Sequence, residues 1–549
     1  MAVQDGQPMN LSDSEDEEWP TEEVQPLLDN KAQTLGGAQH VTNISSVPLI
    51  GSRQCCSARW NLSFLMFLGF SMVYALRVNL SVAMVAMVNS TVPQPVDNST
   101  YLAVCPDHSA DNSSNTSRET LKVQQFQWDS TTQGVILSSF FYGYILTQVP
   151  GGYLAGYFGG KLFLGLGVLV TAALTLLTPL AASLGVPYLV ILRALEGFGE
   201  GVTYPAMNAM WAKWAPPLER SRLMTFSGTG GSFGSFVALP LTGFICHSLG
   251  WAYVFYIFGK LFSTGAAGCI WALLWFCLVT DEPLSHPRIS KQERDHITSS
   301  VGLQGQCHGW TLPFLSMLTS LPLWAIIIAH FCINWSFYTL LTTLPSYMAQ
   351  VLHFSIKENG FLSAVPYFTS WVMSIICGQL ADRMRERRIV STTFVRKMFT
   401  VIGSVLPAAF FIATAFIDCD YVAAMAFLTV SSTLIAANSA GFSINHIDIA
   451  PRYAGVLLGI TNTFGTLPGM IAPTVVGYLT AQNALAGWKI VFYISAAILT
   501  FGGVFYTAFG SGEPQAWSKG IPEGKQRDQK SITSPTLINH PVWSPDPDD

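Results

Sequence analysis

Charged side chains are scarce in this sequence. Only 11% of the 549 residues are Asp, Glu, Lys or Arg, against about a quarter in an average soluble protein. The two ends hold a large share, because residues 1–60 carry 12 of the charges and residues 511–549 carry 10. A middle section so poor in charge excludes an ordinary soluble globular protein.

Several chemical signatures are also missing. The ten cysteines form no Cys-x-x-Cys pair and no Cys/His spacing suited to zinc. No nucleophile stands beside a base, and no basic patch indicates a nucleic-acid partner. We therefore expect neither an enzyme nor a metal protein, and no cofactor.

Long apolar runs fill the middle of the chain. Half of all residues are apolar, and runs of about 20 residues recur, the length that a helix needs to cross the hydrocarbon core of a bilayer. They predict an all-α membrane protein embedded in the lipid bilayer, with 12 transmembrane helices. The expected spans are 61–86, 131–156, 162–183, 187–211, 223–245, 252–279, 319–348, 358–381, 398–417, 421–446, 453–480 and 486–510.

The spans divide the chain into five parts. We expect a disordered cytosolic tail at 1–60, a six-helix half at 61–280 with a lumenal loop at 89–128, a cytosolic linker at 281–318, a second six-helix half at 319–510 and a cytosolic tail at 511–549. No cleavable signal peptide precedes the first span, because the start of the chain is acidic rather than basic.

Two independent signals predict the orientation. The loops on one side carry 14 Lys or Arg residues and those on the other side carry four, and the basic side faces the cytosol. The loop 89–128 on the opposite side contains four Asn-x-Ser/Thr sequons, which are usable only in a lumenal or external loop. Both tails are therefore expected in the cytosol, and the predicted glycosylation sites are Asn89, Asn98, Asn112 and Asn115.

Internal echoes indicate that the halves are related by duplication. Gly152-Tyr-Leu-Ala after the second span is answered by Gly378-Gln-Leu-Ala 226 residues later, and Ala215-Pro after the fourth span by Ala450-Pro 235 residues later. Two pseudo-symmetric six-helix halves joined by a long cytosolic loop resemble the major facilitator superfamily fold.

A few charges lie inside the spans, where each costs about 2.5 to 3.5 kcal/mol and is rarely kept without a role. Arg193, Glu196 and Glu200 follow one another at spacings of three and four on one face of the fourth helix, and Arg77 lies in the first helix. Carboxylates beside guanidinium groups are typical of a proton-coupled anion site. A static ion-pair lattice between the two helices is the alternative.

Polar residues extend this site. Tyr74, Arg77 and Ser81 form a stripe on the first helix, and we expect Tyr144 of the second helix to border the same cavity. We predict that Arg77, Tyr74, Ser81 and Tyr144 bind a small anionic substrate and that Glu196, Glu200 and Arg193 couple its transport to protons. Lys260 in the sixth helix has no predicted role.

Five sequence stretches carry a family resemblance: YALRVNLS from residue 74, SFFYGY from 139, RALEGFGEGVT from 193, WAPPLER from 214 and GFSINH from 441. They are similar to the organic anion and vesicular glutamate transporter family of the major facilitator superfamily, over most of residues 55–518. The resemblance implies alternating access, a carboxylate substrate held by Arg77 and protons carried by Glu196 and Glu200.

Three positions favour one branch of that family, the one that exports sialic acid from lysosomes. Vesicular glutamate transporters have arginine, histidine and glutamine where this chain has Ile333, Leu137 and Glu196. Asn208 departs from the favoured branch, which has a histidine there. The substrates implied are sialic acid and related sugar acids such as glucuronate, or acidic amino acids.

The N-terminal tail contains a sorting motif. Glu23-Val-Gln-Pro-Leu27-Leu28 has the form of an acidic dileucine signal, read by clathrin adaptor proteins, and predicts the lysosomal membrane. The rival functions are potential-driven uptake of aspartate or glutamate into synaptic vesicles and sodium-coupled phosphate transport at the plasma membrane. A sensor without transport activity is a more remote alternative.

Overall fold

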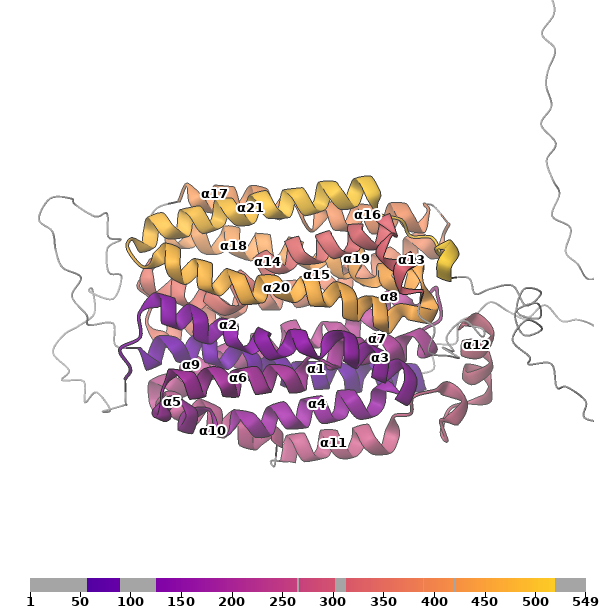
Figure 1. The fold of residues 1–549 in the computed structure, drawn as a ribbon, viewed down its shortest axis with the longest axis horizontal. Coiled ribbons are helices and arrows are strands. Elements are labelled where there is room, and N and C mark those ends of the chain that lie inside the picture. The colour runs from indigo at the N-terminus through magenta and orange to yellow at the C-terminus, as the bar shows by residue number, and fades with distance from the viewer. Residues whose placement is uncertain are drawn as a thin grey trace, which may run out of the picture. The chain divides into compact units, whose positions relative to one another are not determined.

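The computed structural model describes residues 57–88, 125–263, 266–301, 313–388, 390–417 and 420–518. Helices occupy every one of the twelve expected spans. In Figure 1 the helices up to residue 278 form the purple layer of the bundle and those from residue 321 on form the orange and yellow layer.

The first half contains eleven labelled helices: α1 (Ala58–Met87), α2 (Ser130–Leu146), α3 (Gln148–Phe158), α4 (Gly160–Thr175), α5 (Thr178–Leu184), α6 (Val186–Glu200), α7 (Thr203–Trp214), α8 (Arg220–Gly228), α9 (Gly230–Ser248), α10 (Trp251–Ser263) and α11 (Ala266–Leu278). Most expected spans here are two helices in tandem. The fourth breaks between α6 and α7, where Pro205 has no N–H to continue the helical bonding.

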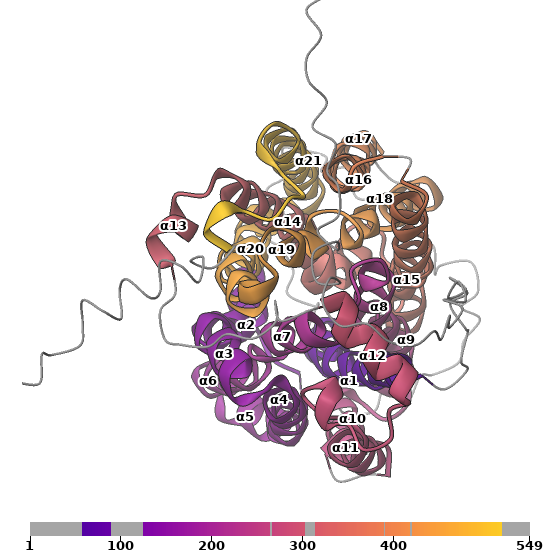
Figure 2. The same ribbon diagram turned by 90° about the vertical axis from the view of Figure 1, so that its right-hand side faces the viewer.

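A short 3-10 turn, η2 (Pro283–Ser285), and α12 (Lys291–Val301) follow in the linker. Figure 2 views the bundle from its end and shows α12 lying across the first half. The buried Glu293 of α12 accepts hydrogen bonds from the backbone N–H groups of Ala58 (3.0 Å) and Arg59 (3.3 Å) at the start of α1. A carboxylate stabilises a helix N-terminus, so the linker is fixed to the first half.

The second half contains the remaining elements: α13 (Phe314–Leu318), α14 (Leu321–Gln350), α15 (Ile356–Glu386), α16 (Thr392–Ile402), α17 (Val405–Ala415), α18 (Tyr421–Ile435), η4 (Ala436–Ser439), α19 (Phe442–Ile449), η5 (Pro451–Tyr453), α20 (Ala454–Thr480), α21 (Ala484–Phe509) and η6 (Ala516–Ser518). The segment after α21 packs back on this half. The N–H of Gln515 donates to the carbonyl of Ile449 (2.9 Å), and Asn445 donates to the carbonyl of Ser511 (2.8 Å).

By length and apolar composition alone, nine helices of the described part can cross a membrane, or ten if the bent pair α4 and α5 counts as one. The expected spans outside this set are the second and the fourth. Both are interrupted, α2–α3 at Thr147 and α6–α7 at Gly201, and the fourth also carries the three predicted charges.

Close helix contacts position the charged residues. A Cβ at Gly143 of α2 would strike the carbonyl of Ala194, and one at Gly197 of α6 would strike the carbonyl of Phe140. Only glycine lets two backbones meet in this way. The crossing holds α6 against α2, with Phe140 beside the charges of α6.

Candidate functional site

A cavity of about 270 Å³ lies between the two halves, and helices of both halves line it. Aromatic rings form one part of its wall: Tyr74, Tyr144, Tyr204, Phe337 and Tyr338. The rest of the lining combines hydroxyl and amide side chains with apolar residues such as Met207, Ile333 and Leu458. A chamber shared by two halves is the arrangement expected for a substrate site in a transporter with repeats.

Arg77 lies directly behind the aromatic wall. Its guanidinium carbon is 4.5 Å from the ring centre of Tyr74, 4.7 Å from that of Phe140 and 5.1 Å from that of Tyr144. The residue is only 6% exposed, and it is not among the cavity-lining residues. The tyrosine rings therefore separate its charge from the cavity.

Glu200 of α6 balances the charge of Arg77. One carboxylate oxygen of Glu200 pairs with Nη2 of Arg77 inside the fold. The other carboxylate oxygen, and Nε and Nη1 of Arg77, have no hydrogen-bond partner among the described residues. Buried polar groups normally find partners, so this pair has unused capacity to bind a further anion on the arginine and a proton on the glutamate.

Arg193 and Glu196 form a second buried pair. Nη1 of Arg193 is 2.5 Å from a carboxylate oxygen of Glu196, and the hydroxyl of Thr178 donates to the other oxygen at 3.4 Å. Neither charged residue lines the cavity. The guanidinium carbon of Arg193 lies 5.3 Å from the ring centre of Phe140, so this one ring contacts both arginines.

Only some of the predicted substrate residues line the cavity in the structure. Tyr74 and Tyr144 line the cavity. Ser81 does not, and its hydroxyl donates to the carbonyl of Val78 in its own helix (2.7 Å).

Sequence reasoning missed several aromatic residues of the site, among them Tyr204 and Phe140. Tyr204 donates to the hydroxyl of Tyr74 (3.2 Å) and lines the cavity, and Phe140 links the two arginines. Both carried a signal, because each lies four residues from a predicted site residue, Glu200 and Tyr144, on the same helical span.

The second half supplies a histidine pair to the cavity wall. The hydroxyl of Thr461 lies 2.7 Å from Nε2 of His446 and 3.3 Å from Nδ1 of His330. Both histidines line the cavity.

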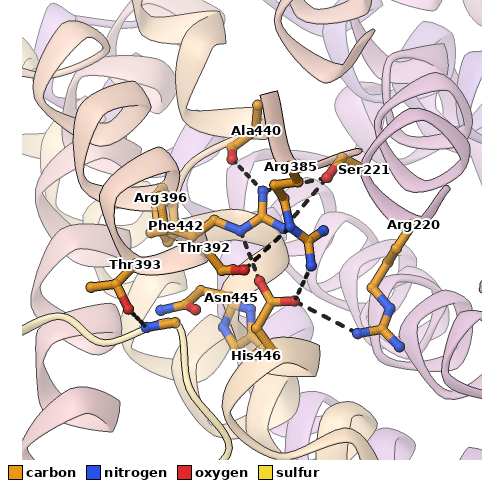
Figure 3. Close-up of polar contacts among 12 residues, drawn as sticks. Arg220, Ser221, Arg385, Thr392, Thr393, Arg396, Ala440, Phe442, Asn445 and His446 are labelled. Carbon is orange, nitrogen blue, oxygen red and sulfur yellow. Dashed lines mark hydrogen bonds and ion pairs between the residues drawn. The ribbon is translucent and has the colours of Figure 1, made fainter. Parts of the chain in front are cut away.

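An ion-pair cluster joins the halves at the predicted cytosolic end (Figure 3). The carboxylate of Asp448 lies 2.7 Å from Arg396, 3.9 Å from Arg385 and 3.6 Å from Arg220. Arg220 belongs to α8 of the first half, whereas the other three residues belong to the second half. At the opposite end, the backbones of α9 and α15 meet at glycines, and the halves contact each other on both sides of the cavity.

Some predicted features lie outside the described residues. These are the sorting motif at Glu23, Leu27 and Leu28 and the sequons at Asn89, Asn98, Asn112 and Asn115. Within the described ranges, no group of three or more His, Cys, Asp or Glu side chains has a geometry that would hold a metal ion.

Comparison with known proteins places the chain in a family. Residues 60–473 match the model of the Major Facilitator Superfamily. Sialin from Homo sapiens is 54% identical over 84% of this chain and 91% of its own length, and sialin from Ovis aries is equally similar. Sodium-dependent phosphate transport protein 3 from Mus musculus is 41% identical over 84% of this chain and 96% of its own length.

The fold agrees with this placement. A partially occluded, inward-open xylose transporter from E. coli superposes with a TM-score of 0.54 at 15% identity, covering 82% of this chain and 99% of the other. Vesicular glutamate transporter 3 from Danio rerio is 39% identical over 84% of this chain and 74% of its own length. The protein is therefore a multi-pass membrane transporter and not an enzyme. It belongs to the major facilitator superfamily, in the family of secondary transporters that contains the sialins, the phosphate transport proteins and the vesicular glutamate transporters.

Proposed function

We propose that this transporter exports sialic acid and related acidic sugars from the lysosome together with protons. The 54% identity to two sialins supports this substrate. The single observation that carries the mechanism is the buried pair of Arg77 and Glu200, held directly behind the tyrosines of the cavity.

The pair explains how substrate and proton are coupled. When a sugar carboxylate reaches the unused nitrogens of Arg77, it competes with Glu200 for the same positive charge. A second carboxylate in this buried place is unfavourable unless one of the two takes a proton. Glu200 then becomes neutral, and the site keeps the same net charge with or without substrate. One anion and one proton therefore cross together.

The tyrosines control access to this exchange. Because Tyr74 and Tyr144 stand between Arg77 and the cavity, their rings must turn to let a carboxylate reach the guanidinium. Glu196 is the second proton carrier in this proposal. Its partner Arg193 and Arg77 both contact the ring of Phe140, so this ring links the second ion pair to the first.

Release follows from alternating access. The halves meet at both ends of the cavity, so opening toward the cytosol requires the cluster around Asp448 to separate. A near-neutral cytosol then removes the proton from Glu200, which pairs with Arg77 again and displaces the substrate.

The acidic dileucine motif at Glu23, Leu27 and Leu28 supports a lysosomal location, with both tails in the cytosol.

Transport by purified full-length protein in liposomes tests the proposal. We expect uptake of labelled N-acetylneuraminate to be stimulated by an inwardly directed proton gradient. Arg77→Ala should abolish uptake, and Glu200→Gln should abolish the dependence on pH. Lys260→Ala is the matched control, because this basic residue lies on the exposed face of α10, away from the cavity.

Three results would count against the assignment. Normal uptake by Arg77→Ala would remove the anion site. Uptake driven by an imposed voltage without a pH difference, with glutamate as the better substrate, would instead support the mode suggested by the names of the vesicular relatives. Stimulation by sodium and inhibition by phosphate would support the mode suggested by the phosphate transport proteins.

A further inference from the structure

The two halves meet along two interfaces that both border the cavity. In the α15 interface, α15 of the second half packs on α8 and α9 of the first half. In the α20 interface, α20 of the second half packs on α2 and α3 of the first half. The two interfaces are counterparts, because the sequence echo pairs Gly152 of α3 with Gly378 of α15. A difference at matching positions therefore shows where the halves have diverged.

Close glycine contacts fix which residues face each other. A Cβ at Gly378 would lie 3.0 Å from the side chain of Thr225, and a Cβ at Gly152 would lie 2.5 Å from the carbonyl oxygen of Gly455. In both interfaces the last part of one helix thus meets the first part of the other. The next turn of α15 therefore lies opposite the start of α8, and the next turn of α3 lies opposite the start of α20.

Asp382 links the halves at the predicted cytosolic end of the α15 interface. It follows Gly378 after four residues and is buried. Its carboxylate accepts a hydrogen bond from the backbone N–H of Arg222 at the start of α8 (2.7 Å), and the side chain of Arg222 pairs with Glu386 of α15 (2.5 Å). The first N–H groups of a helix have no partner within it and favour a negative charge. This carboxylate therefore stabilises the closed contact between α15 and α8.

The α20 interface has no carboxylate at the matching place. Gly156, four residues after Gly152, corresponds to Asp382, and the sequence of α3 contains no Asp or Glu. A Cβ at Gly156 would meet no atom within 4 Å, so a side chain has room there. Arg452, three residues before Gly455, corresponds to Arg222. The basic residue is thus kept in both interfaces, whereas the acid is present in one.

A second acidic position has diverged in the same direction. Asp448 lies two residues before the second copy of the Ala-Pro echo and pairs with Arg220 of α8 (3.6 Å). Lys213 lies two residues before the first copy, and its ammonium group pairs with Glu282 of the linker (2.8 Å). The two acids of the second half that contact the start of α8 are therefore a glycine and a lysine in the first half.

Two neutral hydrogen bonds cross the α20 interface further from the predicted cytosolic end. Asn462 donates to the side-chain oxygen of Gln148 (2.7 Å), and the hydroxyls of Ser138 and Thr474 lie 3.0 Å apart. These bonds stabilise the middle and the lumenal part of this interface. They do not replace a carboxylate at the end of α3.

We propose that Asp382 holds the predicted cytosolic end closed at the α15 interface, and that Gly156, by omitting the matching carboxylate, lets the α20 interface open there. The closed state is then stabilised from one side, which speeds its conversion to the cytosol-open state. This inference goes beyond the proposed function, because it concerns the movement of the halves and holds whichever anion is carried.

Gly156→Asp supplies the missing carboxylate in the full-length protein. The measured quantity is the rate at which a Ser374→Cys reporter in the cavity wall reacts with a membrane-impermeant thiol reagent on the predicted cytosolic side, after subtraction of the rate without the reporter. We expect this rate to fall about two- to thirty-fold relative to Gly156→Asn, the range for a carboxylate at a helix N-terminus. Gly156→Asn is the matched control, because it has the same shape without the charge. Equal rates in the two variants would overturn the proposal.

The same reporter approached from the other side of the membrane separates closure from general stiffening. A carboxylate that stabilises closure of the cytosolic end should not slow the reaction with reagent in the lumenal compartment. A slower reaction from both sides, with correctly folded protein in size-exclusion chromatography, would show a structural effect of the side chain and overturn the proposal.

Moving the carboxylate from one interface to the other gives a further test. Asp382→Asn alone should speed labelling from the predicted cytosolic side, and its combination with Gly156→Asp should bring the rate back toward the wild-type value. A double variant as fast as Asp382→Asn would overturn the proposal. If Asp382→Asn does not fold, the comparison of Gly156→Asp with Gly156→Asn still decides, because both leave the α15 interface unchanged.

Discussion

Removing the charges of Arg77 and Glu200 one at a time and together distinguishes a transport site from a static ion-pair lattice. Arg77→Met keeps the aliphatic stem but leaves the carboxylate of Glu200 buried without its partner. Breaking a buried pair from one side costs about 3–5 kcal/mol. The same variant also loses the contacts of the guanidinium with three rings, and such a contact is worth about 2 kcal/mol when it is desolvated.

Glu200→Gln leaves those ring contacts in place, so it should destabilise less than Arg77→Met. The double variant has no unpaired charge. We expect it to be more stable than the sum of the two single effects predicts, by about 2–3 kcal/mol of coupling. Equilibrium unfolding in mixed micelles gives the three free energies of unfolding.

Transport decides between the two roles. A folded double variant should bind and transport no N-acetylneuraminate, because the anion site and the proton carrier are both gone. Recovery of uptake together with stability would refute the reasoning and make the pair a lattice. Strict additivity of the two single effects would show that the side chains do not interact as the structure places them.

Three further predictions concern other parts of the fold. Asp448→Asn leaves three arginines without their shared carboxylate and should favour the cytosol-open state. A Ser374→Cys reporter in the cavity should then react with a thiol reagent at least several-fold faster. An unchanged labelling rate would contradict the role of the cluster. Gly143→Val places a side chain on a backbone carbonyl of the neighbouring helix and should abolish folded protein in size-exclusion chromatography, whereas normal expression would refute the close crossing. The Thr132 hydroxyl, which is hydrogen-bonded to Asp129, holds the pKa of this capping carboxyl below its usual range. The stabilising effect of the ionised carboxylate is therefore present above the unfolded-state pKa near 4 and is lost only as the pH falls further. Asp129→Asn should give the same change in the free energy of unfolding at pH 5 and pH 7, and a change confined to pH 7 would contradict this.

The composition and the apolar runs were sufficient to predict the fold. Each expected span contains helix, and the family comparison confirms the major facilitator superfamily. The breaks inside the second and fourth spans were not predicted. Proline and glycine marked them, but their effect depends on how neighbouring helices satisfy the freed backbone groups.

The candidate site was predicted as a set of residues and not as an arrangement. Spacing along one helix placed Glu196 and Glu200 on the same face. Their division into separate pairs, Glu200 with Arg77 and Glu196 with Arg193, depends on side-chain rotamers and on the approach of α2. Neither follows from the spacing of charges.

The orientation of the cavity asparagines was likewise beyond the sequence. An asparagine offers both donors and an acceptor, and its residue type does not say which of these a neighbouring protein group meets. The carbonyls of Tyr204 and Gly403 decide this for Asn208 and Asn438. The carbonyl of Gly403 can accept this bond because α16 ends there.

The segment after α21 bears on how the gene should be trimmed for expression. Hydropathy alone suggests a boundary at Phe509, where the last apolar helix ends. A stop codon there would delete the backbone groups that bond to Asn445, Thr393 and Ile449. Shortened versions and C-terminal fusions should therefore retain the chain through Ser518.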